Sequence, residues 1–177
     1  GAAGLFVVAV PLFLIATSVR WVISTPLLYT YGFDKYNITD STPKRIERDG
    51  LLSAGRQIRD YFNDDEEFLI IRVVVEGVRV RSLFNSREVL HMRDVKSLVR
   101  GVYRVQEVTA AYLALFAAVG LAVWRRRFLP QLTRVVMLGG FATLGLVGLA
   151  GVGALVGFDR LFLAFHLVSF SNDLWQL

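Results

Sequence analysis

The sequence contains no cysteine and only two histidines, His91 and His166. The absence of cysteine excludes disulfide bonds, thiolate nucleophiles and thiolate metal sites. Two histidines with scattered carboxylates are weak evidence for a zinc site, which needs three or four ligands. The glycine-rich motifs of nucleotide-binding proteins and the nucleophile elbow of serine hydrolases are also absent. We therefore expect neither a metal ion nor another cofactor.

Acidic and basic residues are missing from residues 108–124, a long apolar stretch that is followed directly by Arg125, Arg126 and Arg127. Hydrophobic residues make up 54% of the 177 residues, which is typical of a membrane protein rather than a soluble domain. The net charge of +5 comes from arginines near the ends of apolar stretches, while residues 25–102 are nearly neutral. This distribution favours contact with lipid headgroups and argues against nucleic acid as a partner.

The apolar stretches predict an α-helical integral membrane protein with three transmembrane helices in this chain, at residues 1–24, 103–127 and 131–158. A signal peptide is the alternative for the first stretch, but neither a basic n-region nor a clear small-residue cleavage site is visible. The third helix is rich in glycine, and Gly153 and Gly157 form a GxxxG pair that favours close helix packing. Arg20 and Trp21 fit an anchor at the membrane interface.

Residues 25–102 are predicted to form a small α+β insert outside the membrane. Thr42 and Pro43 are suitable N-terminal residues for an amphipathic helix that continues to about residue 62. Residues 68–75 are predicted to form one strand of a β-hairpin, and residues 78–84, in which apolar residues alternate with arginines, form its partner. A long helix then begins at Asn85 or Ser86, either of which can cap it.

The short basic connection at residues 125–134 is the strongest positive-inside signal in the sequence. We therefore expect a multi-pass protein of the cell membrane in which this connection is cytoplasmic. The insert at residues 25–102 and the last segment, residues 159–177, are then both extracytoplasmic.

Both histidines are expected at the same membrane face. His91 and Asp94 are three residues apart on one helix face, so the carboxylate could orient the imidazole. His166 is followed closely by Ser169, Asn172 and Asp173, an unusual number of polar side chains for a simple exit from the membrane. The alternatives are a solvated surface histidine for His91 and a plain interface histidine for His166.

These segments resemble the bacterial lipoprotein intramolecular transacylase family of integral membrane proteins, in an order that spans nearly the whole chain. Members of the family continue past the tryptophan into a last, fourth transmembrane helix, which these 177 residues do not include. The residues that carry the resemblance are Pro11 to Ile15 with Ser18, Val19 and Arg20; Leu28 and Tyr29 with Gly32 to Tyr36; Tyr61 and Phe62; Leu83 to Glu88; the HxxDVK segment from His91 to Lys96; and Phe165 and His166 with the Phe170 to Trp175 segment.

The resemblance implies an enzyme that moves an acyl chain from the sn-2 glycerol oxygen of a diacylglyceryl-cysteine lipoprotein to the α-amine of the same cysteine. It implies that His91 and His166 are catalytic, and we expect Asp94, Asn172 and Asp173 to support them. The expected partners are membrane lipids and a lipoprotein N-terminus. The alternative is a non-catalytic accessory subunit of a larger bacterial membrane complex, respiratory or photosynthetic.

Overall fold

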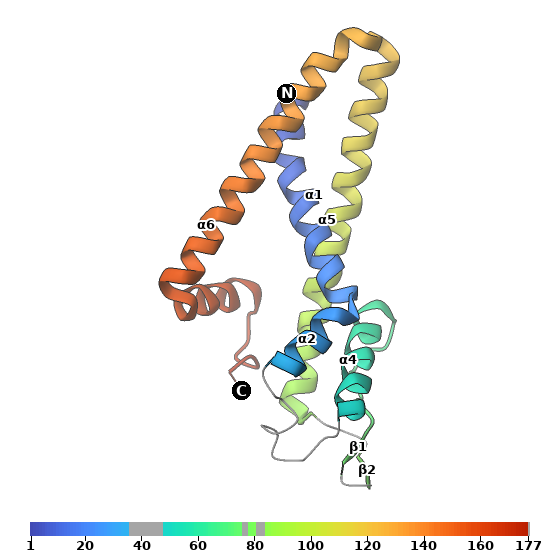
Figure 1. Ribbon diagram of the computed structural model, residues 1–177, viewed down its shortest axis with the longest axis vertical. Helices are drawn as coiled ribbons and strands as arrows, with labels where there is room; N and C mark the ends of the chain where they lie inside the picture. Colours follow the sequence, from blue (N-terminus) through green and yellow to red (C-terminus); the bar gives the residue numbers. More distant parts are fainter. Residues whose placement is uncertain (36–47, 76–77, 81–83, 177) are drawn as a thin grey trace. The chain divides into compact units, whose positions relative to one another are not determined.

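The computed structural model describes residues 1–35, 48–75, 78–80 and 84–176 of the chain (Figure 1). The described residues are mostly helical, and they divide into two compact units. Unit 1 comprises residues 1–20 and 101–169, and unit 2 comprises residues 21–100 and 170–177. The helix α5 (Ser86–Trp124) contributes its first part to unit 2 and its remainder to unit 1.

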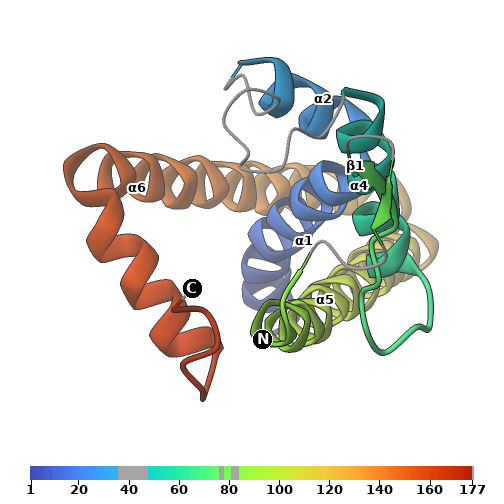
Figure 2. The ribbon, with the colours of Figure 1, turned by 90° about the horizontal axis from the view of Figure 1, so that it is seen from below.

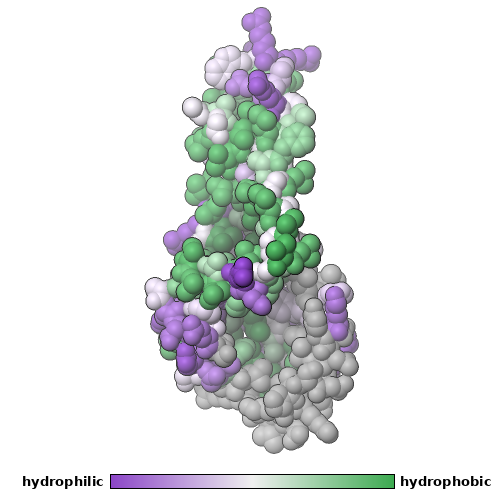
Figure 3. All heavy atoms as spheres, turned by 90° about the vertical axis from the view of Figure 1, so that its left-hand side faces the viewer, coloured by the Kyte–Doolittle hydropathy of each residue, from purple (hydrophilic) through white to green (hydrophobic). Residues whose placement is uncertain are grey.

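Unit 1 is built from α1 (Ala2–Ser24), the second part of α5, the 3-10 turn η1 (Arg125–Phe128) and α6 (Leu129–Ser169). Among the described residues, α1 and the continuous run Ser86–Ser169 are long and apolar enough to cross a membrane, with mean hydropathies of 2.3 and 2.1. Large apolar side chains stay exposed, and Leu155 reaches 90%. Figure 3 shows this apolar surface in green, with hydrophilic side chains gathered at the η1 end.

The core of unit 1 lies where α1, α5 and α6 meet. Phe6 and Val10 of α1 and Val135 of α6 are buried in it. The centroid of the Phe6 ring lies 4.7 Å from that of Phe116 on α5. Lipid tails are as apolar as these side chains, so the hydrophobic effect does not drive the helices together in a membrane. Close packing of this kind stabilises their association instead.

Two glycines allow the closest approaches within this unit. A Cβ added at Gly139 of α6 would lie 2.5 Å from the Cβ of Val10, and one added at Gly120 would overlap the ring of Phe128. Gly140, the next residue, faces open space. The residues at these two contacts must therefore be glycine for the helices to approach as they do.

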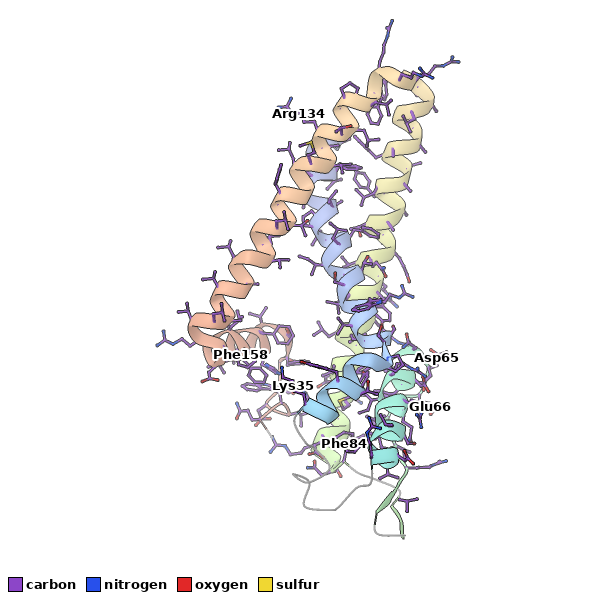
Figure 4. All side chains as sticks on the ribbon, in the orientation of Figure 1. Lys35, Asp65, Glu66, Phe84, Arg134 and Phe158 are labelled. Atoms are coloured by element: carbon purple, nitrogen blue, oxygen red, sulfur yellow. The ribbon has the colours of Figure 1, made fainter. Side chains whose placement is uncertain are left out.

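The predicted GxxxG pair has a different role from the expected one. No described atom lies within 4 Å of a Cβ added at Gly153. Gly157 instead marks a break in α6, where its φ of −168° and ψ of 66° interrupt the helix. The chain changes direction there, just before Phe158 (Figures 2 and 4).

Polar side chains also join α1 to α5. Arg20 donates from Nη1 to Oε1 of Gln106 at 2.9 Å and to Oε1 of Glu107 at 3.3 Å. Its guanidinium carbon lies 4.5 Å from the centroid of the Tyr103 ring. Gln106 in turn donates to the hydroxyl of Thr17 at 3.0 Å. Arg20, expected to reach the headgroups, is thus held by its neighbours on α5.

Unit 2 contains α2 (Pro26–Lys35), which the sequence did not predict as a helix, and α4 (Arg48–Asn63). The helix α4 packs on α2 and on the first strand, and it buries Leu51, Ala54, Tyr61 and Phe62 on one face. Its amphipathic pattern explains this burial. The cap predicted at Thr42 and Pro43 lies outside the described residues.

The first strand is shorter than the predicted residues 68–75, and residues 81–83 of the predicted second strand lie outside the described part of the chain. β1 (Val73–Val75) pairs antiparallel with β2 (Val78–Val80), with Val73 opposite Val80. Burial nevertheless alternates from Leu69, as expected for an extended chain. The side chain of Gln57 donates to the carbonyl of Arg72 at 3.0 Å and accepts from its N–H at 2.9 Å. These two bonds fasten the backbone of Arg72 to α4.

A buried lysine ties the loop after α4 to α5. Lys96 is 6% exposed, and its Nζ donates to Oδ1 of Asp64 at 2.8 Å and to the carbonyl of Glu66 at 2.6 Å (Figure 4 labels Glu66). The ammonium also lies 4.0 Å from the centroid of the Tyr61 ring. Burial, followed by the charge of Asp64, raises the pKa of the Tyr61 hydroxyl, which donates to the carbonyl of Glu67 at 2.9 Å.

The contact at Gly139 makes a prediction about stability. Gly139→Ala should lower the free energy of unfolding by about 1–3 kcal/mol, because its methyl group overlaps Val10. Gly140→Ala is the matched control, and it should cost nothing because the space beside it is open. Thermal denaturation of the purified protein in detergent measures both. Equal melting temperatures for the two variants would contradict the packing described here.

Candidate functional site

The helix that carries His91 begins with a reciprocal cap at Asn85. The Oδ1 atom of Asn85 accepts from the N–H groups of Arg87 at 2.9 Å and Glu88 at 3.0 Å. The carboxylate of Glu88 accepts from the N–H of Asn85 at 2.6 Å. This capping box fixes the start of α5, and it confirms Asn85 rather than Ser86 as the N-cap.

His91 lies one and a half turns into α5 and is half-buried. The edge of the Phe170 ring meets the imidazole at 65°, with a distance of 5.1 Å between centroids. Phe170 belongs to the segment of residues 170–176, which follows α6. An aromatic ring in this position restricts the orientation of the imidazole.

Two further contacts fasten the segment of residues 170–176 to α5. The Nδ2 atom of Asn172 donates to Oδ2 of Asp94 at 2.8 Å. The Nη2 atom of Arg87 donates to the backbone carbonyl of Asp173 at 3.0 Å. The Oδ1 atom of Asn172 accepts from the N–H of Leu174 at 3.1 Å, which turns the segment back on itself. Together with the ring contact, these bonds place the segment along the side of α5 that carries His91.

His166 lies near the end of α6, within unit 1, and only 8% of it is exposed although its neighbours on the helix are exposed. Its Nδ1 lies 2.8 Å from the carbonyl oxygen of Phe162, and its ring packs on Phe162 and Phe165. A carbonyl oxygen can only accept, so Nδ1 carries the hydrogen. In the neutral imidazole the lone pair is then on Nε2, the form of a general base.

The predicted site residues are distributed over both units. The structure brings Asp94 and Asn172 into direct contact and places Asp173 beside them, while His166 has surroundings of its own. Asp173 contributes its backbone carbonyl to the contact with Arg87. No role was predicted for Arg87 or Phe170 from the sequence. A signal for Arg87 was present, because a cation in the first turn of a helix opposes the helix dipole.

Within the described part of the chain, no group of three or more histidine and acidic side chains is arranged to hold a metal ion. The predicted site residues supply imidazole, carboxylate and amide groups. These groups move protons and orient one another.

The long helices with exposed apolar surfaces define a membrane-integral helical protein. The family model described as lipoprotein intramolecular transacylase Lit matches residues 4–177. The chain therefore belongs to the lipoprotein intramolecular transacylase family, and it is a membrane protein.

Solved structures support the same fold. The in meso structure of the membrane integral lipoprotein intramolecular transacylase Lit from Bacillus cereus is similar with a TM-score of 0.73 at 17% identity, over 99% of this chain and 74% of that one. A structure of that protein with one histidine changed to alanine gives a TM-score of 0.70 at 16% identity, over 97% of this chain and 71% of that one. No curated protein matches the chain.

The hydrogen bonds that hold residues 170–176 on α5 lead to a prediction that can be tested without measuring activity. Arg87→Gln and Asn172→Ala should each speed amide hydrogen exchange in this segment by up to about tenfold, the effect of losing one hydrogen bond of roughly 1.4 kcal/mol. Exchange followed by mass spectrometry of the full protein measures this. Arg104→Gln, which changes an exposed arginine elsewhere on α5, should leave the segment unchanged. If amide hydrogen exchange in residues 170–176 were unchanged in both the Arg87 and the Asn172 variant, these two side chains would not hold the segment on α5.

Proposed function

We propose that this protein transfers the sn-2 acyl chain of a diacylglyceryl-cysteine lipoprotein to the α-amine of the same cysteine. The family to which the chain belongs supports a lipoprotein transacylase. The observation that carries the proposal is the contact of residues 170–176, which directly follow α6 and His166, with the face of α5 that carries His91. The comparisons give no support to the alternative of an accessory subunit.

The reaction needs a base and an acid but consumes neither water nor a cofactor. The amine nitrogen attacks the ester carbonyl carbon, a C–N bond forms, and the bond to the glycerol oxygen breaks. An α-amine has a pKa near ~8 and must lose a proton to attack. One imidazole accepts that proton, and either imidazole returns one to the departing glycerol oxygen.

The chain itself supports a site that uses both histidines. Only three residues separate His166 from Phe170, whose ring contacts His91. Four residues span at most about 14 Å, even when fully extended. His166 is thus close along the chain to a residue that contacts His91. In an intramolecular transfer, positioning of the reacting groups supplies much of the rate enhancement.

Asp94 and Asn172 have supporting roles in this proposal. The carboxylate of Asp94 lies one turn after His91 and holds Asn172 through one N–H of its amide. An amide nitrogen has two N–H groups, so Asn172 retains a second one for the oxyanion that forms when the amine attacks. Asp173 positions the segment through its backbone carbonyl.

The proposed topology has three membrane spans in these 177 residues: α1, the apolar part of α5, and α6 up to the break at Gly157. The connection at residues 125–134 is cytoplasmic, because its arginines are the strongest topology signal. The insert at residues 25–102 and the segment at residues 159–177 are extracytoplasmic, where the N-termini of lipoproteins are exposed.

The catalytic assignment is tested by expression in a bacterial host that lacks this activity. His91→Ala and His166→Ala should each reduce the lyso-form lipoprotein by about a hundredfold or more, because each removes a proton-transfer group. Mass spectrometry of lipoprotein N-termini measures the product. Asp159→Asn, an exposed change on α6, should leave product formation intact. Full activity in either alanine variant would falsify the assignment.

The topology is tested by cysteine labelling, since the chain has no cysteine of its own. A thiol introduced by Ser171→Cys should react with a membrane-impermeant maleimide on intact spheroplasts. A thiol introduced by Arg126→Cys should react only after the membrane is permeabilised. Both positions are exposed, so a reversed pattern would mean that the orientation is inverted.

A further inference from the structure

Unit 1 contains a cavity at its η1 end, far along α6 from His166. Its volume is about 480 Å³, which is within the range of small-ligand sites. The rings of Phe116 and Phe128 form apolar walls together with Gly1 and the first turn of α1, and Trp124, Arg127 and Gln131 complete the lining. The Phe128 ring is held firmly, because it is buried and packs directly against Gly120.

The rim of this cavity is strongly basic. Arg125, Arg126 and Arg127 form η1 and are all exposed, and none forms an ion pair with a residue that the structure describes. The sequence has no acidic residue from position 108 to position 158. The positive charge is therefore not neutralised locally, and Figure 3 shows the hydrophilic cap that it forms.

We propose that this cavity binds one anionic phospholipid. The guanidinium of Arg127 pairs with the lipid phosphate, a geometry for which arginine is well suited. The glycerol backbone and the first part of an acyl chain occupy the apolar interior, against the rings of Phe116 and Phe128 and the first turn of α1. Trp124, whose ring stacks on Phe128 at 27°, lies where the headgroup meets the chains.

The combination of charge and apolar surface identifies a lipid rather than a free anion. A soluble phosphate would gain nothing from the aromatic walls, whereas a phospholipid uses both parts of the site.

This lipid is not the acyl donor. The helical part of α6 from Leu129 to the break at Gly157 is about 42 Å long at 1.5 Å per residue, and His166 lies beyond that break. The inference therefore goes beyond the proposed transfer.

Trp124 provides a direct probe of occupancy. The full chain with Trp21→Phe and Trp175→Phe has Trp124 as its only tryptophan. In vesicles, brominated phosphatidylglycerol should quench its fluorescence with an apparent affinity about fivefold above that of brominated phosphatidylcholine, as expected for one arginine near a lipid surface. Introducing Arg127→Gln into this single-tryptophan variant should remove its preference for phosphatidylglycerol over phosphatidylcholine.

Two controls separate the proposal from general attraction to charge. Arg134→Gln removes an exposed arginine on α6 that does not line the cavity, so it should keep the preference (Figure 4). Soluble glycerophosphate should not displace the brominated lipid, so the fluorescence of Trp124 should stay quenched when it is added. Equal quenching by the two lipids, equal losses in the two arginine variants, or displacement by glycerophosphate would each overturn the proposal.

Discussion

The contact between residues 170–176 and the first turns of α5 is the constraint on which the proposed chemistry depends. It joins segments about 80 positions apart through contacts of different kinds: an aromatic edge on His91, an amide on Asp94, and an arginine on a backbone carbonyl. Because these contacts use different groups, no single one has to be strong. An acyl transfer within one molecule is sensitive to displacements of about 1 Å, so a segment held at several points suits it.

The same turns of α5 are held on their opposite face. At 100° per residue, Arg87, His91 and Asp94 form one stripe, and Arg93, Lys96 and Arg100 form another roughly 150° away. The second stripe binds the acidic loop after α4, through Glu67, Asp64 and Asp65 respectively. Lys96 is the strongest of these anchors because its ammonium is buried and bonded twice. A helix held on both faces presents its histidine in a defined orientation.

The sequence was informative where a pattern has a single physical cause. The apolar stretches follow from hydropathy, and the cap at Asn85 follows from the capping preferences of helix N-termini. Contacts between distant segments leave no such local pattern, so the bond from Asn172 to Asp94 was not predictable. One local interpretation also gave way to the observed packing. Gly157 breaks α6 instead of packing against another helix. This outcome depends on which neighbours the fold supplies.

Arg87 shows how a violated local rule points to a site. A cation in the first turn of a helix is unfavourable by about 0.3–1 kcal/mol, whereas Glu88 beside it obeys the rule and completes the cap. Capping alone therefore does not account for an arginine at this position, and its bond to the carbonyl of Asp173 does. Departures of this kind are expected where a sequence serves function as well as folding. The cost at Arg87 is offset only when residues 170–176 are in place, which couples the start of α5 to the segment that follows His166.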